Sequence, residues 1–156
     1  FEDMEEAVQT GISTVIVDTG PSPSEWHNAI YTAVDAVIIP VFCEPLGVAG
    51  LYNTISHLQK ANRMRSKDGR PPLRILGVVP NMHRSITSLH RLQLEEVSAT
   101  LAPHGIPIVD PIELRVVWGD ATRAHKTIYA HDPESDSAIQ MAALASDLLQ
   151  KERVHV

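Results

Sequence analysis

Short apolar runs alternate along the chain with longer segments in which apolar residues recur every three or four positions. The runs are rich in β-branched residues and end near Gly, Pro or Asn, which predicts buried strands over residues 13–18, 36–41, 73–80 and 106–112. The periodic segments predict amphipathic helices over residues 24–33, 45–64, 87–101 and 135–153.

This alternation of strands and helices predicts the fold class. Strands separated by helices form parallel βαβ units with right-handed crossovers. We therefore expect a single α/β domain over residues 1–156, with a doubly wound, mainly parallel sheet and flanking helices. Ligands of such sheets bind beyond the carboxyl ends of the strands. Candidate site residues should follow the runs that end near Asp18, Val41, Pro80 and Ile112.

Composition narrows the class of protein. The chain has 156 residues, of which 44% are hydrophobic and 21% charged, so it can bury a core without a disulfide or a metal. Its one cysteine, Cys43, cannot form an internal disulfide, and no metal-ligand spacing of Cys and His is present. No apolar run approaches the ~18 residues of a membrane span. We expect a soluble, cytoplasmic protein without a membrane partner.

Charge is distributed unevenly, although the net charge is only −6. Residues 1–59 contain eight acidic side chains and no Lys or Arg, whereas residues 60–91 contain eight basic side chains and one acidic one. A basic island of this kind is most often a solvated loop and helix face, and the alternative is the electrostatic footprint of a polyanionic partner.

Four segments near the expected strand ends resemble one family. They are VIVDTGPS at 15–22, VIIPVFCEPLGVAGL at 37–51, ILGVVPNMHRSITSLHR at 75–91, and Asp110-Pro111 followed by AHDPESDSA at 130–138. In this order they resemble the carboxyl-terminal half of ParA-type partition ATPases. That family belongs to the deviant Walker-A class of P-loop ATPases and is related to MinD. The resemblance implies a weak ATP hydrolase that uses ATP and Mg²⁺ to partition chromosomes or plasmids.

The resemblance also implies roles for individual residues. Asp18 resembles the Walker B carboxylate that holds Mg²⁺ through water, and Thr19, Gly20 and Pro21 resemble the switch that senses the γ-phosphate. Asn81 resembles the asparagine that reads the adenine edge, because an amide offers a donor and an acceptor together. Pro111 resembles the proline that packs along the base.

The residues taken alone allow simpler structural interpretations. An Asp before Thr-Gly-Pro is commonly a turn or cap residue, and Asn81 after a strand suits a turn. Cys43 suits a small core position.

Five basic residues are candidates for DNA contacts. Arg84 and Arg91 would share a helix face if the helix began near Arg84. Arg115, Arg123 and Lys126 lie where, in the resembling family, basic residues contact DNA in the ATP-bound dimer. The implied partners are nonspecific DNA, a ParB-like centromere-binding protein and a second copy of the chain, in a nucleoid-associated setting. The basic residues from Lys60 to Arg74 could join this surface or only keep a loop soluble.

One signature of the family is missing from the sequence. No G-x-x-x-x-G-K-[ST] motif is present, and the first lysine is Lys60. We therefore expect part of a longer ATPase, and expect these residues alone to bind ATP weakly or not at all and to be inactive. The other hypothesis is a noncatalytic protein-interaction module that keeps the same fold without a P-loop.

Overall fold

The structure is a computed structural model that describes residues 10–20 and 25–153. In chain order its elements are α2 (Glu25–Ala33), β1 (Ala36–Phe42), α3 (Pro45–Lys67), β2 (Arg74–Asn81), α4 (Ser88–Leu101), η1 (Ala102–His104), α5 (Val116–Arg123), α6 (Ile128–His131) and α7 (Asp136–Arg153).

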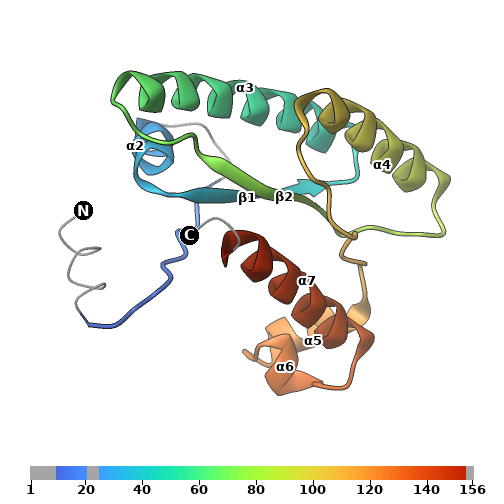
Figure 1. The fold of residues 1–156 in the computed structure, drawn as a ribbon. Helices are drawn as coiled ribbons and strands as arrows, with labels where there is room; N and C mark the ends of the chain where they lie inside the picture. The colour runs from blue at the N-terminus through green and yellow to red at the C-terminus, as the bar shows by residue number, and fades with distance from the viewer. Residues whose placement is uncertain (1–9, 21–24, 154–156) are drawn as a thin grey trace.

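The two strands form a parallel pair with α3 as the crossover between them (Figure 1). The register places Ala36 opposite Arg74 and Phe42 opposite Asn81, with one irregularity between Val37 and Ile38. The carboxyl ends of β1 and β2 therefore meet at one edge of the sheet. This pair confirms the strands expected over residues 36–41 and 73–80.

The segment of residues 106–114 lies along the other side of β2. It forms two isolated parallel bridges, Val78 with Ile108 and His83 with Glu113. The Ile112 amide also donates to the Pro80 carbonyl at 2.8 Å. The strand expected over residues 106–112 is thus present only as separate bridges, because Pro107 and Pro111 have no N–H to give a continuous ladder.

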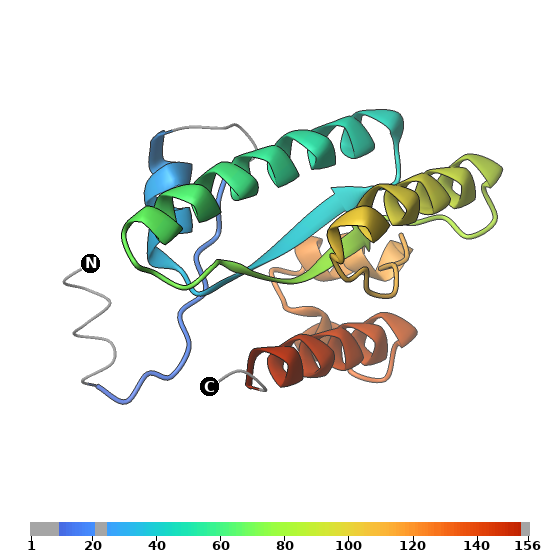
Figure 2. The ribbon, with the colours of Figure 1, turned by 45° about the horizontal axis from the view of Figure 1, so that its top comes forward.

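One face of the sheet is covered by α3 and α4 (Figures 1 and 2). Residues of α3 at helical spacing are buried against the strands, as the apolar pattern predicts: Leu51, Ile55, Leu58 and Ala61. Val97 and Leu101 of α4 join the same core with Val78 of β2, which has no exposed surface.

The opposite face is covered at β2 by α7, which lies on the other side of the strands in both views (Figures 1 and 2). Here Val79 of β2 packs with Val109, Ile112 and Leu148. The apolar spacing of α7 puts Ala142 and Ala145 on the same side of the helix as Leu148, yet both are exposed. The described residues thus form a mixed α/β fold with helices on both faces of a two-stranded parallel sheet, and further wound strands stay a prediction.

Two arginines of the basic island, one in α3 and one in the loop after it, hold the end of α2 in place. The guanidinium of Arg65, only 3% exposed, donates to the carbonyls of Tyr31, Thr32 and Val34 at 2.8–3.0 Å and to that of Pro71 at 2.7 Å. Arg70 donates to the Thr32 carbonyl as well, at 2.8 Å. The carbonyls at the end of α2 lack partners within their own helix, so these cations cap it.

The strand expected over residues 13–18 is not formed. The whole segment is exposed and makes no strand pairing, with Ile16 at 90% exposure. An extended apolar run is stable as a strand only when a neighbour pairs its backbone and covers its side chains. In the part of the chain that the structure describes, no neighbouring strand lies beside it.

Two short helices, α5 and α6, lie in a region where the apolar pattern predicts no helix. No helix among the described residues is long and apolar enough to cross a membrane.

Candidate functional site

The carboxyl ends of β1 and β2 border a small hollow, here called the strand-end hollow. Its volume is about 160 Å³, and it is lined by Phe42, Cys43, Glu44, Asn81, Met82, Arg84, His90 and Leu114. This is below the roughly 300–1,000 Å³ of complete ligand pockets, so the hollow is too small for a whole nucleotide.

Asn81 is the last residue of β2 and turns its side chain back to the main chain. Its Oδ1 accepts from the Met82 amide at 2.8 Å. Met82 has a left-handed backbone with φ of 52°, which is uncommon for a residue other than Gly, Asn or Asp. This turn directs the chain out of the sheet at the hollow. A second amide-oxygen lone pair and the NH₂ group of Asn81 can then serve a ligand.

Two buried histidines support the loop that follows Asn81. His83 and His90 are 7% and 9% exposed, with ring centroids 5.9 Å apart. The Arg84 amide donates to Nδ1 of His90 at 3.1 Å, so that nitrogen must be unprotonated to accept. Burial lowers the pKa of His83, the positive charge of a protonated His90 would lower it further, and Glu113 opposes both effects. The loop is therefore supported by two buried rings, and burial favours the neutral form of His83.

At the end of β1, Cys43 is buried and α3 starts in direct contact with the strand. Burial raises the pKa of the Cys43 thiol, which keeps it protonated and consistent with a core role. A Cβ on Gly47 would lie 2.2 Å from the Phe42 carbonyl oxygen. Glycine at this position is therefore what allows α3 to begin so close to the sheet.

Pro111 reaches the same edge from the third segment. Its carbonyl accepts from Nε2 of Gln140 at 2.7 Å, and the next residue is bonded to the Pro80 carbonyl, adjacent to Asn81. Pro111 does not line the hollow itself. The structure thus brings the segment that contains Pro111 to the same sheet edge as Asn81.

Asp18, Thr19 and Gly20 lie elsewhere. They are exposed on the segment that forms no strand, and none of them lines the strand-end hollow. The Gly20 carbonyl lies 3.0 Å from Nε2 of His27 in α2. Pro21 falls outside the described residues. No group of three or more His, Cys, Asp or Glu in the described ranges could hold a metal.

The predicted DNA-contact residues differ in how much of their charge is used within the chain. Arg115 is held by Asp136 at 2.5 Å and by Glu113 at 2.8 Å. The hydrogen bond to Asp136 is the main reason that the pKa of Arg115 is raised. Arg123 is 82% exposed at its side chain but pairs with Asp120 at 2.7 Å.

Arg84, Arg91 and Lys126 are exposed. Because α4 begins at Ser88, Arg84 lies before the helix and does not share a helix face with Arg91.

Sequence reasoning missed three features of this region. The histidine pair and the left-handed Met82 depend on the path of a loop, which no periodicity reveals. The roles of Arg65 and Arg70 depend on carbonyls more than thirty residues away. The sequence did contain one clue to the roles of Arg65 and Arg70. The 23 residues of α3 include no acidic side chain that could pair with these arginines locally.

The chain is similar to known proteins of Bacillus and Pseudomonas. No family model matches the chain. It is 31% identical over 143 residues to the sporulation initiation inhibitor protein Soj of Bacillus subtilis, across 92% of this chain and 54% of Soj. It is also 29% identical over 142 residues to an uncharacterized protein of Pseudomonas putida KT2440, across 89% of this chain and 51% of that protein.

A Pseudomonas putida protein described by its position in the gidB 3′ region gives the same figures. The chain thus spans about half the length of the curated relatives it matches. The similarity to Soj supports the ParA/Soj-like resemblance at the level of the family.

Proposed function

We propose that this chain is part of a ParA-like ATPase that partitions DNA, and that it supplies the adenine side of the nucleotide site. The observation that carries the proposal is the similarity to Soj over 92% of the chain. Within this chain, Asn81 lies at the carboxyl edge of two parallel strands. That edge is where open α/β sheets bind their ligands.

In the proposed protein, the residues at this edge have separate tasks. The free donor and acceptor of the Asn81 amide pair with the adenine edge, and the segment containing Pro111 lies along the base. Asp18 holds Mg²⁺ through water, while Thr19, Gly20 and Pro21 respond to the γ-phosphate. A single carboxylate is a suitable donor, because Mg²⁺ usually takes one or two carboxylates together with substrate phosphates. The phosphate-binding loop comes from residues other than these 156.

The proposal includes a cycle of assembly. ATP closes a dimer of the full-length protein, the dimer binds DNA without sequence preference, and a ParB-like partner stimulates hydrolysis and release. The metal supplies charge neutralisation at the β- and γ-phosphates when it is bound.

The test is ATP binding and hydrolysis by the full-length protein and two variants. Asp18→Ala should lower turnover by roughly 10–100-fold or more, as expected for loss of an outer-sphere metal contact. Asn81→Ala should weaken ATP binding and reduce the preference for ATP over GTP by roughly 5–150-fold, the equivalent of one bidentate base contact.

Asp35→Ala is the matched control, because this exposed aspartate lies outside the site. Turnover of Asp18→Ala within a few-fold of wild type would contradict the Walker B role. A full-length protein that binds no ATP at all would favour the noncatalytic interaction module instead.

A further inference from the structure

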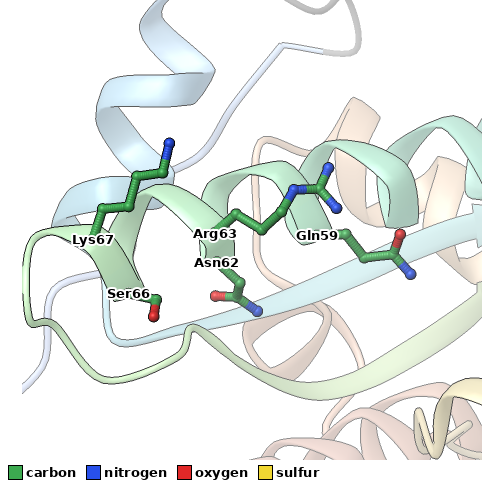
Figure 3. Close-up of a pocket in the computed structure, with 5 residues that line it drawn as sticks. All are labelled: Gln59, Asn62, Arg63, Ser66 and Lys67. Atoms are coloured by element: carbon green, nitrogen blue, oxygen red, sulfur yellow. The ribbon is translucent and has the colours of Figure 1, made fainter.

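The outer side of α3 carries a shallow hollow remote from the strand ends. Its volume is about 520 Å³, and its walls are five side chains of α3 alone: Gln59, Asn62, Arg63, Ser66 and Lys67 (Figure 3). Together with the neighbouring Lys60, these residues are called the α3 cationic face. It lies toward the end of α3 that precedes β2, at the opposite edge of the sheet from the strand-end hollow.

The basic residues of this part of the chain fall into two groups. Arg65 and Arg70 cap α2, and Arg74 pairs with Glu152 at 3.5 Å, so their charges serve the fold. Lys60, Arg63 and Lys67 are exposed, and no ion pair found among the described residues includes them. The positive charges of this second group are therefore available to bind another molecule.

The spacing of these three cations matches a linear polyanion. Positions 60, 63 and 67 follow the i, i+3, i+7 rule and share one side of the helix. They span about 10 Å along the axis at 1.5 Å per residue. A DNA strand carries one phosphate for each ~3.4 Å of helix axis, so three cations over this length meet a comparable density of negative charge.

Two simpler explanations for these three cations fit less well, namely a helix face that is only solvated and a favourable interaction with the helix dipole. A merely solvated helix face usually mixes acidic and basic side chains, yet α3 has no acidic residue although the whole chain has a net charge of −6. Favourable interaction with the helix dipole accounts for a cation in the last turn, such as Lys67. Lys60 and Arg63 lie before that turn.

We propose that the α3 cationic face binds the phosphate backbone of duplex DNA. Its neutral lining residues are Gln59, Asn62 and Ser66, whose amide and hydroxyl groups are common donors to phosphate oxygens. The lining has no aromatic or large apolar side chain of the kind that anchors a protein partner. The inference rests on the DNA partner of the proposed function, but it assigns that contact to a surface other than Arg115 and Arg123. Because it lies at the opposite edge of the sheet, DNA here leaves the nucleotide edge open.

The experiment measures binding of the full-length protein with ATP to a random-sequence duplex at several salt concentrations. The triple variant Lys60→Ala, Arg63→Ala, Lys67→Ala should lower affinity at least 10-fold. The slope of log affinity against log salt should become shallower by about 0.9 for each phosphate that the variant no longer neutralises. The variant Lys60→Arg, Lys67→Arg keeps the charges and should keep the wild-type slope.

Controls separate this inference from the proposed function. Lys151→Ala removes a lysine on α7 that pairs with Asp147 at 2.7 Å, and it should leave the salt slope nearly unchanged. The thermal midpoint and ATP turnover of the triple variant should match wild type, which excludes misfolding. If wild type binds DNA with ATP but the triple variant has the same affinity and slope, this surface assignment is wrong and the proposed function stands. If wild type itself binds no DNA, the DNA part of the proposed function fails.

Discussion

The two strands of the sheet have similar apolar sequences but very different surroundings. β2 lies between β1 and residues 106–114, and both of its faces are covered, with Val78 and Val79 almost completely buried. In β1 the residues facing α3 are buried, whereas Ile38 and Phe42 on the other face are about half exposed.

This difference shows what an apolar run can and cannot predict. A continuous run of β-branched residues favours a strand that is covered on both faces. Among the described residues, both faces of β2 are packed against other elements, but only one face of β1 is. Burial of a strand is thus a property of its neighbours, and substitutions in the two strands can measure it.

The largest expected effect is at the junction of β1 and α3. In Gly47→Ala the new Cβ would meet the Phe42 carbonyl oxygen at 2.2 Å, and a backbone atom cannot move aside cheaply. We expect a loss of about 3 kcal/mol or more in the free energy of unfolding, measured by urea denaturation of the full-length protein. Gly50→Ala, three residues further along α3 with open space around it, should instead stabilise by up to about 1 kcal/mol. Equal effects at both positions would show that α3 does not begin against β1.

Arg65 comes next, because it joins the segments that precede both strands. Arg65→Ala removes the buried cap of α2 and leaves several carbonyls without their donor. A loss of about 2–3 kcal/mol is expected from charged hydrogen bonds of this kind. Arg63→Ala, on the exposed side of the same helix, should change stability by less than about 0.5 kcal/mol. A similar thermal midpoint for both variants would rule out the capping role.

A direct comparison of the strands uses Val78→Ala and Ile38→Ala. Val78 has no exposed surface, so its truncation should cost about 2 kcal/mol. Ile38 is 48% exposed and should cost less than half as much, although more carbon is removed. If chemical denaturation of the full-length protein gives equal losses, the outer face of β1 is covered there by residues outside 10–20 and 25–153.

The smallest effect is a pH dependence at the end of β2. Because burial holds the pKa of His83 below its ordinary value of 6.5, the unfolded chain binds a proton that the folded chain resists. The contribution of His83 to the free energy of unfolding should therefore be fully present above about pH 7.5, and it should be lost as the pH drops through about 6.5. His83→Gln should flatten this decline in thermal midpoint between about pH 8 and about pH 5.5, whereas substitution of the exposed His104 should not. An unchanged decline in His83→Gln would assign the pH effect to other groups.

Local patterns predicted the elements whose partners are close in the chain. The α3 stripe from Leu51 to Ala61 is buried as its spacing indicates, and Asn81 and the Pro111 segment reach one edge because parallel strands end together. The strand predicted over residues 13–18 was wrong, since an apolar run carries no information about whether a partner strand is present. Arg115 could be recognised as basic, but its pairing with Asp136 joins positions 21 residues apart.

The cap that Arg65 makes has a consequence for the rate at which the protein unfolds. Its acceptors on α2 lie 31–34 residues earlier in the chain, so the guanidinium can bind them only after both helices and the intervening strand have come together. Contacts of such sequence separation tend to form late. Interactions absent from the transition state act on the unfolding rate and leave the folding rate nearly unchanged. Arg65 should therefore slow unfolding and lengthen the lifetime of the native state, with little effect on the folding rate.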